Sequence, residues 1–306
     1  MTSEIAVAHL AKRFGTTAAV SEVTFAVEPG EIFGLVGPDG AGKSTILRML
    51  AGVMRPDRGT IAVDGVDVVK SPEQVKGHVS YMPQRFGLYE DLTVDENIRF
   101  YADLFGVDAA TREARARPLL DASDMSRFRK RLAGQLSGGM KQKLGLTCSL
   151  VHAPKVLLLD EPTTGVDPLS RRDFWRILFK LRESGVTLVI ATAYLDEAER
   201  CNRLALLHHG SLRYCDTPAA LKRRMSGMLV VVSSPAPRAV RDRLQRLPGL
   251  GNVVMVGDGV HVVADSEGRI ADMRRALTAA EIPFSAVERT EPSVEDVFMA
   301  LLKEPA

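Results

Sequence analysis

The chain has 306 residues, of which 45 % are hydrophobic and 25 % are charged, as is typical of a soluble globular protein long enough for two domains. The net charge of +2 excludes a strongly basic overall field, so we expect no nucleic acid as the main partner. The three cysteines form no CxxC pair, which favours reduced thiols in a cytoplasmic protein. We find no N-terminal signal peptide and no apolar run of about 18 residues, so the sequence predicts no membrane span.

The first two thirds of the chain predict strands that alternate with helices. Residues 5–27 alternate apolar and polar side chains like short strands, and a hairpin ends at Asp64 and Gly65. Thr93 and Glu96 form the signature of a helix capping box. Further strands are expected at residues 31–37, 78–84, 155–160, 186–192 and 203–210, and helices at 44–50, within 93–150, at 170–184 and after 194. This alternation predicts an α/β fold with a largely parallel sheet covered on both faces.

A different pattern follows Met225, Ser226 and Gly227. The expected elements are a strand at 228–234, a helix at 238–247, a hairpin of 252–258 and 259–265, a helix at 269–282, a strand at 284–289 and a helix at 293–302. This βαββαβ order with one more helix predicts a small ferredoxin-like α+β domain. We therefore expect two domains, residues 4–227 and 228–306.

Residues 37–45, GPDGAGKST, match the phosphate-loop pattern G-x-x-x-x-G-K-[ST] between a strand and a helix. The glycines let backbone N–H groups face phosphate oxygens, Lys43 adds charge for the β- and γ-phosphates, and Ser44 offers a hydroxyl to Mg²⁺. A glycine-rich turn without a ligand is disfavoured because the pattern and its context agree. The predicted nucleotide-binding residues of this phosphate loop are Gly37, Pro38, Asp39, Gly40, Ala41, Gly42, Lys43, Ser44 and Thr45.

An apolar strand, VLLLDEP at residues 156–162, brings Asp160 to the carboxyl edge of the sheet. A carboxylate there can hold Mg²⁺ directly or through water, and Glu161 can polarise an attacking water. A hydrophobic strand that ends in Asp-Glu is common by itself. Together with the phosphate loop it predicts a nucleoside triphosphatase site.

Residues 136–143, LSGGMKQK, lead into a helix and predict a second helix N-terminus able to hold an anion. An ordinary serine N-cap is the alternative. Two phosphate-binding segments in one chain leave two arrangements open. In the first arrangement, both segments of one chain hold the same nucleotide. In the second, two chains hold nucleotides between them, with one segment from each chain.

In combination and order, these motifs resemble those of the ATP-binding subunits of ABC transporters, over about residues 5–225. In that family GPDGAGKST is the Walker A loop, VLLLDEP the Walker B strand and LSGGMKQ the signature motif. The resemblance implies that the signature motif, through Ser137, Gly138, Gly139 and Gln142, grips the γ-phosphate of ATP bound to the opposite subunit of a head-to-tail dimer.

The resemblance extends to three further residues. Phe14 resembles the aromatic residue that stacks on adenine, and a strand residue of the core is the alternative. Gln84 resembles the glutamine that senses Mg²⁺, with a polar strand end as the alternative; with Ser44 and Asp160 it completes the implied metal ligands. Asp167, in TTGVDP (residues 163–168, the D-loop), resembles the residue that faces the partner chain, although the family usually has leucine where Val166 stands.

The family's switch histidine is missing here, because Ala193 occupies its place before YLDEAER. Losing one donor to developing charge costs on the order of 2.7–4 kcal/mol, or 10²–10³ in rate. Glu161 is retained, so the site is weakened. Three explanations stay open: a partner subunit with its own histidine, a slow homodimer, or an experimental substitution.

The motif DEAER and the segment EPSVEDVFMALL resemble subunits of ABC-2 type exporters. The resemblance implies ATP hydrolysis with ATP and Mg²⁺ bound, at the cytoplasmic face of the membrane. The implied partners are separate integral-membrane permease subunits and a second ATP-binding subunit, identical or different. Two alternatives stay open: a soluble ABC ATPase acting on ribosomes or DNA, and an ATP-binding regulatory subunit with little turnover.

Overall fold

The computed structural model describes residues 3–257 and 259–301. The chain divides into two compact units, of which the first ends at Asp216 and the second begins at Thr217. The predicted boundary between residues 227 and 228 falls inside the second unit, and the assignment of residues to domains stays a prediction.

The first unit is built on a six-stranded sheet in the order β10-β9-β3-β8-β7-β6. Four neighbouring pairs are parallel, and only β10 runs antiparallel to its neighbour β9. Its strands are β3 (Ile32–Val36), β6 (Val79–Met82), β7 (Val156–Asp160), β8 (Thr187–Thr192), β9 (Arg203–His208) and β10 (Ser211–Asp216). The three central strands β3, β7 and β8 are buried along their whole length, because both faces of the sheet are covered. The predicted parallel sheet is confirmed, whereas β10 is not among the predicted strands.

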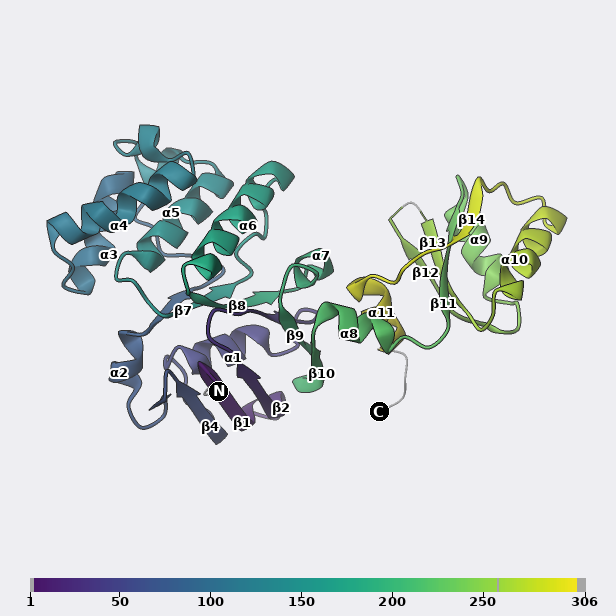
Figure 1. Cartoon of the computed structure of the whole chain (residues 1–306), viewed down its shortest axis with the longest axis horizontal. Helices are drawn as coiled ribbons and strands as arrows, with labels where there is room; N and C mark the ends of the chain where they lie inside the picture. Colours follow the sequence, from purple (N-terminus) through teal and green to yellow (C-terminus); the bar gives the residue numbers. More distant parts are fainter. Residues whose placement is uncertain (1–2, 258, 302–306) are drawn as a thin grey trace. The chain divides into compact units, whose positions relative to one another are not determined.

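An antiparallel sheet in the order β2-β1-β4-β5 covers one face through helix α1, which lies between the two sheets (Figure 1). Its members are β1 (Ile5–Phe14), β2 (Thr17–Val27), β4 (Arg58–Val63) and β5 (Val66–Asp67), with α1 (Lys43–Leu50) and α2 (Pro72–Lys76) nearby. The rings of Phe25 and Phe33 stack at 5.2 Å between the antiparallel and the main sheet. The period-two pattern of residues 5–27 arises because one face of this sheet packs on the core.

Helices α5 (Gly138–Leu150) and α6 (Pro168–Glu183) cover the other face of the main sheet, where Leu146 and Trp175 pack against Leu188. Helices α3 (Val94–Leu104) and α4 (Ala109–Ala122), two 3₁₀ turns at Ser126–Phe128 and Ala133–Gln135, and α5 share a separate core. The capping box is present: Glu96 N donates to Thr93 Oγ1, and Thr93 N donates to Glu96 Oε2. The short helix α7 (Leu195–Ala198) follows β8. Among the described residues, no helix combines the length and hydrophobicity needed to cross a bilayer.

The second unit has an antiparallel sheet in the order β12-β13-β11-β14. Its elements are α8 (Pro218–Arg223), β11 (Met228–Ser233), α9 (Pro237–Leu244), β12 (Leu250–Val256), β13 (Gly259–Ala264), α10 (Gly268–Ala279), β14 (Ala286–Arg289) and α11 (Val294–Leu301). Valines of the sheet pack against Leu244 of α9 and Met273 of α10 to form its core. The ferredoxin-like assignment stays a prediction, and Asp258 of the predicted hairpin lies outside the described residues, as do residues 302–306.

Candidate nucleotide-binding site

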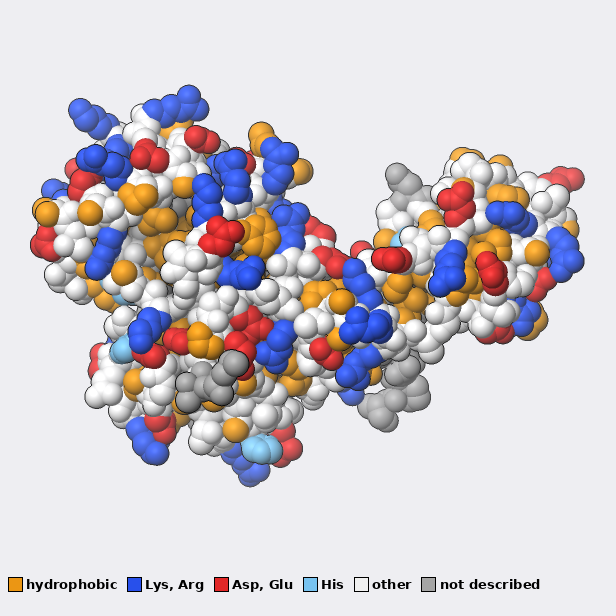
Figure 2. Space-filling model, in the orientation of Figure 1, with side chains coloured by type: hydrophobic (Ala, Val, Ile, Leu, Met, Phe, Trp, Pro, Cys, Tyr) orange, Lys and Arg blue, Asp and Glu red, His pale blue; other side chains and the backbone are white. Residues whose placement is uncertain are grey.

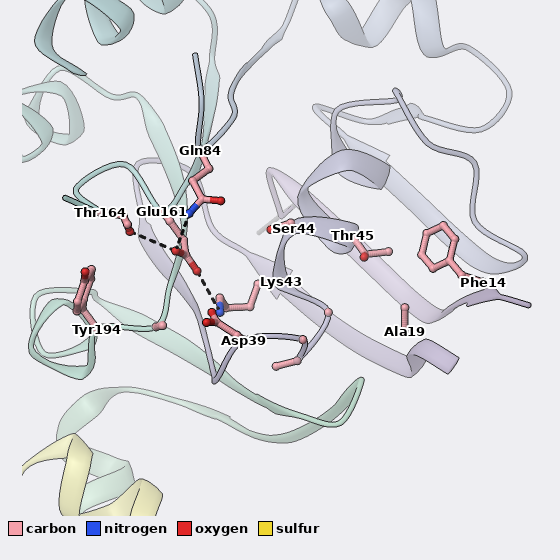
Figure 3. A pocket seen from close by; sticks show the side chains of 14 residues that line it. Phe14, Ala19, Asp39, Lys43, Ser44, Thr45, Gln84, Glu161, Thr164 and Tyr194 are labelled. Carbon is pink, nitrogen blue, oxygen red and sulfur yellow. Dashed lines mark hydrogen bonds and ion pairs between the residues drawn. The ribbon is translucent and has the colours of Figure 1, made fainter. Parts of the chain in front are cut away.

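A cavity of about 680 Å³ lies beside the N-terminal end of α1 and the loops that follow β7 and β8 (Figure 3). This volume is within the range of small-molecule sites, about 300–1,000 Å³. The lining residues come from segments far apart in sequence: Phe14, Ala19, Asp39, Gly40, Ala41, Gly42, Lys43, Ser44, Thr45, Gln84, Glu161, Thr164, Ala193 and Tyr194. The carboxyl edge of a parallel sheet is where α/β proteins bind their ligands.

The phosphate loop needs glycine at position 42 because of its backbone. Gly42 has φ +98° and is the N-cap of α1, and a Cβ there would lie 2.4 Å from the carbonyl oxygen of Ala19. The loop therefore packs closely on β2 before α1 begins. The first N–H groups of α1 have no partners within the helix, which makes its N-terminus a site for anions.

Lys43 is buried, with only 4 % of its side chain exposed, and it has three oxygen neighbours. Its Nζ donates to the carbonyl oxygens of Gly37, at 2.8 Å, and Pro38, at 3.1 Å, and lies 3.4 Å from Glu161 Oε1. Gly37 and Pro38 do not line the cavity themselves. Their carbonyls instead hold the lysine ammonium group, which itself lines the cavity.

Glu161 is, with Asp39, one of the two carboxylate side chains among the described residues that line the cavity. Its Oε2 accepts hydrogen bonds from Thr164 Oγ1, at 3.2 Å, and Gln84 Nε2, at 3.4 Å (Figure 3). The backbone has φ +48°, a left-handed conformation that costs a non-glycine residue on the order of 1–3 kcal/mol. A hydrogen bond from Glu161 N to the carbonyl oxygen of Ala191 holds this conformation, at 2.9 Å. The surrounding structure thus fixes where the carboxylate lies.

Asp160 is buried behind the cavity and accepts hydrogen bonds at both oxygens. Ser44 Oγ donates to Oδ1 at 2.8 Å, and the Tyr81 hydroxyl donates to Oδ2 at 3.0 Å. Burial, together with the Asp160 carboxylate, raises the pKa of Tyr81 to about 12, so the phenol stays a donor. The described residues contain no cluster of three or more His, Cys, Asp or Glu side chains suited to a metal. The oxygens of Ser44, Asp160 and Gln84 nevertheless suit Mg²⁺, which often takes one or two protein ligands and completes its shell with water and substrate phosphate.

Phe14 stands at one end of the cavity and is 50 % exposed. Lys12 Nζ lies 5.8 Å from the centre of its ring. A core residue would be buried, so the alternative interpretation of Phe14 is excluded. An exposed ring at a cavity wall is available for stacking.

Ala193 and Tyr194 form the wall that follows β8. Tyr194 is 38 % exposed, and the guanidinium group of Arg171 lies 4.5 Å from the centre of its ring. No histidine is among the described residues that line the cavity. This wall therefore offers a methyl group and a phenol in place of an imidazole.

The signature motif and Asp167 do not line this cavity. Ser137 caps α5 by accepting a hydrogen bond from Met140 N at 3.3 Å, which agrees with the N-cap interpretation. Asp167 caps α6, and the hydrogen bond from Ser170 N lowers the pKa of its carboxyl group. Ser137, Gly138, Gly139, Gln142 and Asp167 thus lie outside the cavity of their own chain.

Sequence reasoning missed Ala19, Tyr81 and Thr164. Ala19 and Tyr81 reach the site only through the pairing and packing of strands, and no motif marks them. Thr164 could have been predicted from the sequence, because it lies three residues after Glu161 and its hydroxyl can reach that carboxylate.

Comparison with known proteins identifies the family. A family profile described as ABC transporter matches residues 20–164. The probable multidrug ABC transporter ATP-binding protein YbhF of Escherichia coli (strain K12) is 44 % identical over 286 residues, which are 93 % of this chain but 49 % of that protein, so the chain spans about half its length. The Nod factor export ATP-binding protein I of Burkholderia lata is 40 % identical over 238 residues, 77 % of this chain and 78 % of that protein. A solved ATP-binding subunit of an ABC transporter is 32 % identical with a TM-score of 0.66, covering 73 % of this chain and 93 % of that one. The chain belongs to the family of ABC transporter ATP-binding proteins.

Proposed function

We propose that the chain is an ATP-hydrolysing subunit of a membrane exporter of the ABC-2 type. The observation that carries this proposal is the convergence of Lys43, Ser44, Gln84 and Glu161 on one cavity at the N-terminus of α1. The named relatives, a multidrug transporter protein and a Nod factor export protein, support export as the process.

ATP binding follows from the chemistry of the cavity wall. The N-terminus of α1 and the Lys43 ammonium group bind the phosphates, because both carry positive charge toward the cavity. The exposed ring of Phe14 stacks on adenine, and such stacking contributes roughly 1–3 kcal/mol per base. Ser44, Asp160 and Gln84 would hold Mg²⁺, which neutralises charge on the phosphate oxygens when bound.

Hydrolysis depends on Glu161. Its carboxylate lies at the cavity surface beside Lys43 and orients the water that attacks the γ-phosphorus. The bond between the γ-phosphorus and the bridging oxygen breaks, and ADP and inorganic phosphate are released. Ala193 offers no donor to the developing charge, so we expect turnover to be slow in this site.

The second ATP-binding subunit completes the site. The signature motif lies outside the cavity of its own chain, which favours the arrangement in which it contacts ATP held by a partner. Asp167 and the exposed side chain of Leu169 at the start of α6 face that partner. The partner is a second copy of this chain or a related subunit that has its own histidine.

The permease subunits dock on the helical layer of α3, α4 and α5. Figure 2 shows hydrophobic side chains on the surface of this layer, and Tyr89, Leu104 and Phe105 are exposed there. The segment after Gln84 is tied to α3 by ring contacts between Phe86 and Tyr101, at 5.0 Å, and between Tyr89 and Phe100, at 4.5 Å. We infer that a change at Gln84 is passed along this segment and its packed aromatic side chains to the docking surface. The subunit acts at the cytoplasmic face of the membrane.

Steady-state hydrolysis of Mg-ATP by the purified chain tests this function, beside Ala193→His and Glu161→Gln. Turnover above the Glu161→Gln background supports a working ATPase. ATP binding without turnover in either the unmodified chain or Ala193→His favours a regulatory subunit. Co-purification with a multi-span membrane protein supports the exporter, and co-purification with ribosomes or DNA contradicts it.

A further inference from the structure

Glu197 is a fully buried carboxylate close to the site but outside the cavity. It lies in α7, within the switch segment, which we define as residues 193–198. Its Oε1 accepts hydrogen bonds from Thr163 Oγ1, at 2.5 Å, and Trp175 Nε1, at 3.1 Å, and pairs with Arg171 Nε at 2.9 Å. Its Oε2 has no hydrogen-bond partner among the described residues. A buried charge is tolerated only with such compensation, so the three donors and Glu197 depend on one another.

Two of the three donors, Thr163 and Arg171, lie at the two ends of one short segment. Thr163 comes two residues after Glu161, and Arg171 is in the first turn of α6, four residues after Asp167. A single carboxylate oxygen therefore ties together the beginning and the end of residues 163–171. We call these residues the D-loop segment.

Arg171 connects the D-loop segment to the switch segment a second time. Its Nη2 donates to Asp196 Oδ1 at 2.8 Å, and its guanidinium group stacks on the Tyr194 ring. Tyr194 lines the cavity, whereas Glu197 does not. The contacts of Glu197 therefore lie behind Tyr194, which forms part of the cavity wall.

The D-loop segment also contacts the signature motif of the same chain. Gly139 lies so near Ser170 that a Cβ on the glycine would be 2.6 Å from Ser170 Cβ. The residue after Ser170 is Arg171, the ion-pair partner of Glu197. A shift of Arg171 would therefore also move Ser170, against which the first turn of the signature helix α5 packs.

We propose that Glu197 is a positioning residue that holds the D-loop segment between the switch segment and the signature motif. It thereby sets how one chain presents Asp167 and the signature motif to ATP held by the second subunit. This inference rests on the proposed function, because it concerns the same site. The role is mechanical: Glu197 does not touch ATP, and it acts through Thr163 and Arg171.

The variant Glu197→Gln tests the proposal because it keeps the side-chain size and removes the charge. Glu183→Gln, at the exposed end of α6, makes the same chemical change as a control. Hydrogen exchange of the full chain, measured by mass spectrometry without nucleotide, should be about tenfold faster in peptides that cover 163–171 and 193–198. Peptides that cover β3 and β7 should not change. The Kd for ATP should stay within about twofold, while kcat falls by about 10²-fold in the Ala193→His background, because misplacement by about 1 Å has this effect.

A double variant separates positioning from general stability. If Glu197 acts through Arg171, then Glu197→Gln added to Arg171→Gln gives no further increase in exchange. Uniformly faster exchange in all peptides of the first unit, together with weaker ATP binding, would overturn the proposal in favour of a structural role. Unchanged exchange in 163–171 would overturn it as well. Failure of the unmodified chain to bind ATP speaks against the proposed function, and the exchange pattern, measured without nucleotide, still decides the role of Glu197.

Discussion

The ammonium group of Lys43 lies 3.4 Å from the carboxylate of Glu161, and 4 % of the lysine side chain and 15 % of the glutamate side chain are exposed. The two groups to which we assign phosphate binding and water orientation thus neutralise each other across the cavity. A γ-phosphate entering the site competes with Glu161 for Lys43. We therefore expect substitutions of Lys43 to weaken ATP binding and substitutions of Glu161 to slow hydrolysis.

Replacing the lysine should abolish most ATP binding. In Lys43→Ala the site loses its buried cation, and the carbonyl groups of Gly37 and Pro38 lose their donor. We expect the Kd for ATP to rise at least about 100-fold, or about 2.8 kcal/mol. Titration with a fluorescent ATP analogue measures this, and Lys70→Ala, at an exposed lysine, is the matched control. An unchanged Kd would contradict the assignment.

Replacing the glutamate should separate binding from turnover. In Glu161→Gln the amide cannot polarise water as a carboxylate does, and Lys43 loses its competing anion. We expect kcat to fall by about 10²–10³ while ATP binds as tightly as before or more tightly. Single-turnover hydrolysis and equilibrium binding on the same preparation check both parts. A parallel loss of affinity would mean that Glu161 serves binding instead.

Restoring an imidazole at the switch position should raise turnover. Ala193 lines the cavity, so a histidine there can reach the reacting phosphate. A positioned donor contributes about 2.7–4 kcal/mol, which corresponds to an increase of about 10²–10³ in kcat. Ala193→Leu, which adds a side chain of about the volume of histidine but no donor, controls for bulk. Equal rates in the two variants would show that hydrogen bonding at this position does not limit the reaction.

The contact between the signature motif and α6 predicts a rescue. Gly139→Ala places a Cβ 2.6 Å from Ser170 Cβ, so one helix must move. Overpacking of this kind costs about 1–3 kcal/mol of unfolding free energy. Urea unfolding should show this loss in Gly139→Ala and its partial recovery in Gly139→Ala with Ser170→Gly, which removes the opposing side chain. If the double variant is simply less stable than either single one, the contact is not the cause.

In the second unit, Asp296 of α11 predicts a pH dependence. Its Oδ1 is 2.6 Å from His261 Nδ1 on β13, and Ser293 donates to its Oδ2 through N, at 2.8 Å, and Oγ, at 2.6 Å. Burial alone would raise the pKa of Asp296, but the hydrogen bonds from His261 and Ser293 outweigh it and hold the pKa below its usual value. The unfolded chain then binds the proton more readily, so this contribution is present above the unfolded pKa of about 3.9 and is lost as pH falls through the lower folded value.

Thermal unfolding of the full chain and of Asp296→Asn between neutral pH and pH 3 checks this sign. The unmodified chain should be the more stable at neutral pH, and the difference should shrink at the acid end. Glu295→Gln, an exposed acid of the same helix, should show no such convergence. A difference that stays constant with pH would assign the effect to packing instead.

Local patterns along the sequence were sufficient for the parts of the site that are contiguous. Three features depend only on residues close together in sequence: the phosphate loop, the strand that ends at Asp160 and the capping box of Thr93. The spacing of such residues follows from the local backbone conformation, so it predicts these features. The parallel sheet followed from the alternation of apolar strands with helices. Strand β10 and helix α8 were missed because an edge strand and a short helix leave weak periodicity.

Tertiary structure alone decided which separate segments meet. Tyr81 bonds to Asp160 because β6 pairs with β7, and Glu197 bonds to Thr163 because α7 packs behind the loop that follows β7. Neither contact has a local signature, since strand order and helix packing are set by burial over the whole first unit. The resemblance of the sequence to the family identified the missing histidine at position 193, whereas the structure located Ala193 in the wall of the cavity. Chemistry carried by consecutive residues is therefore visible in the sequence, and chemistry that depends on packing distant segments requires the fold.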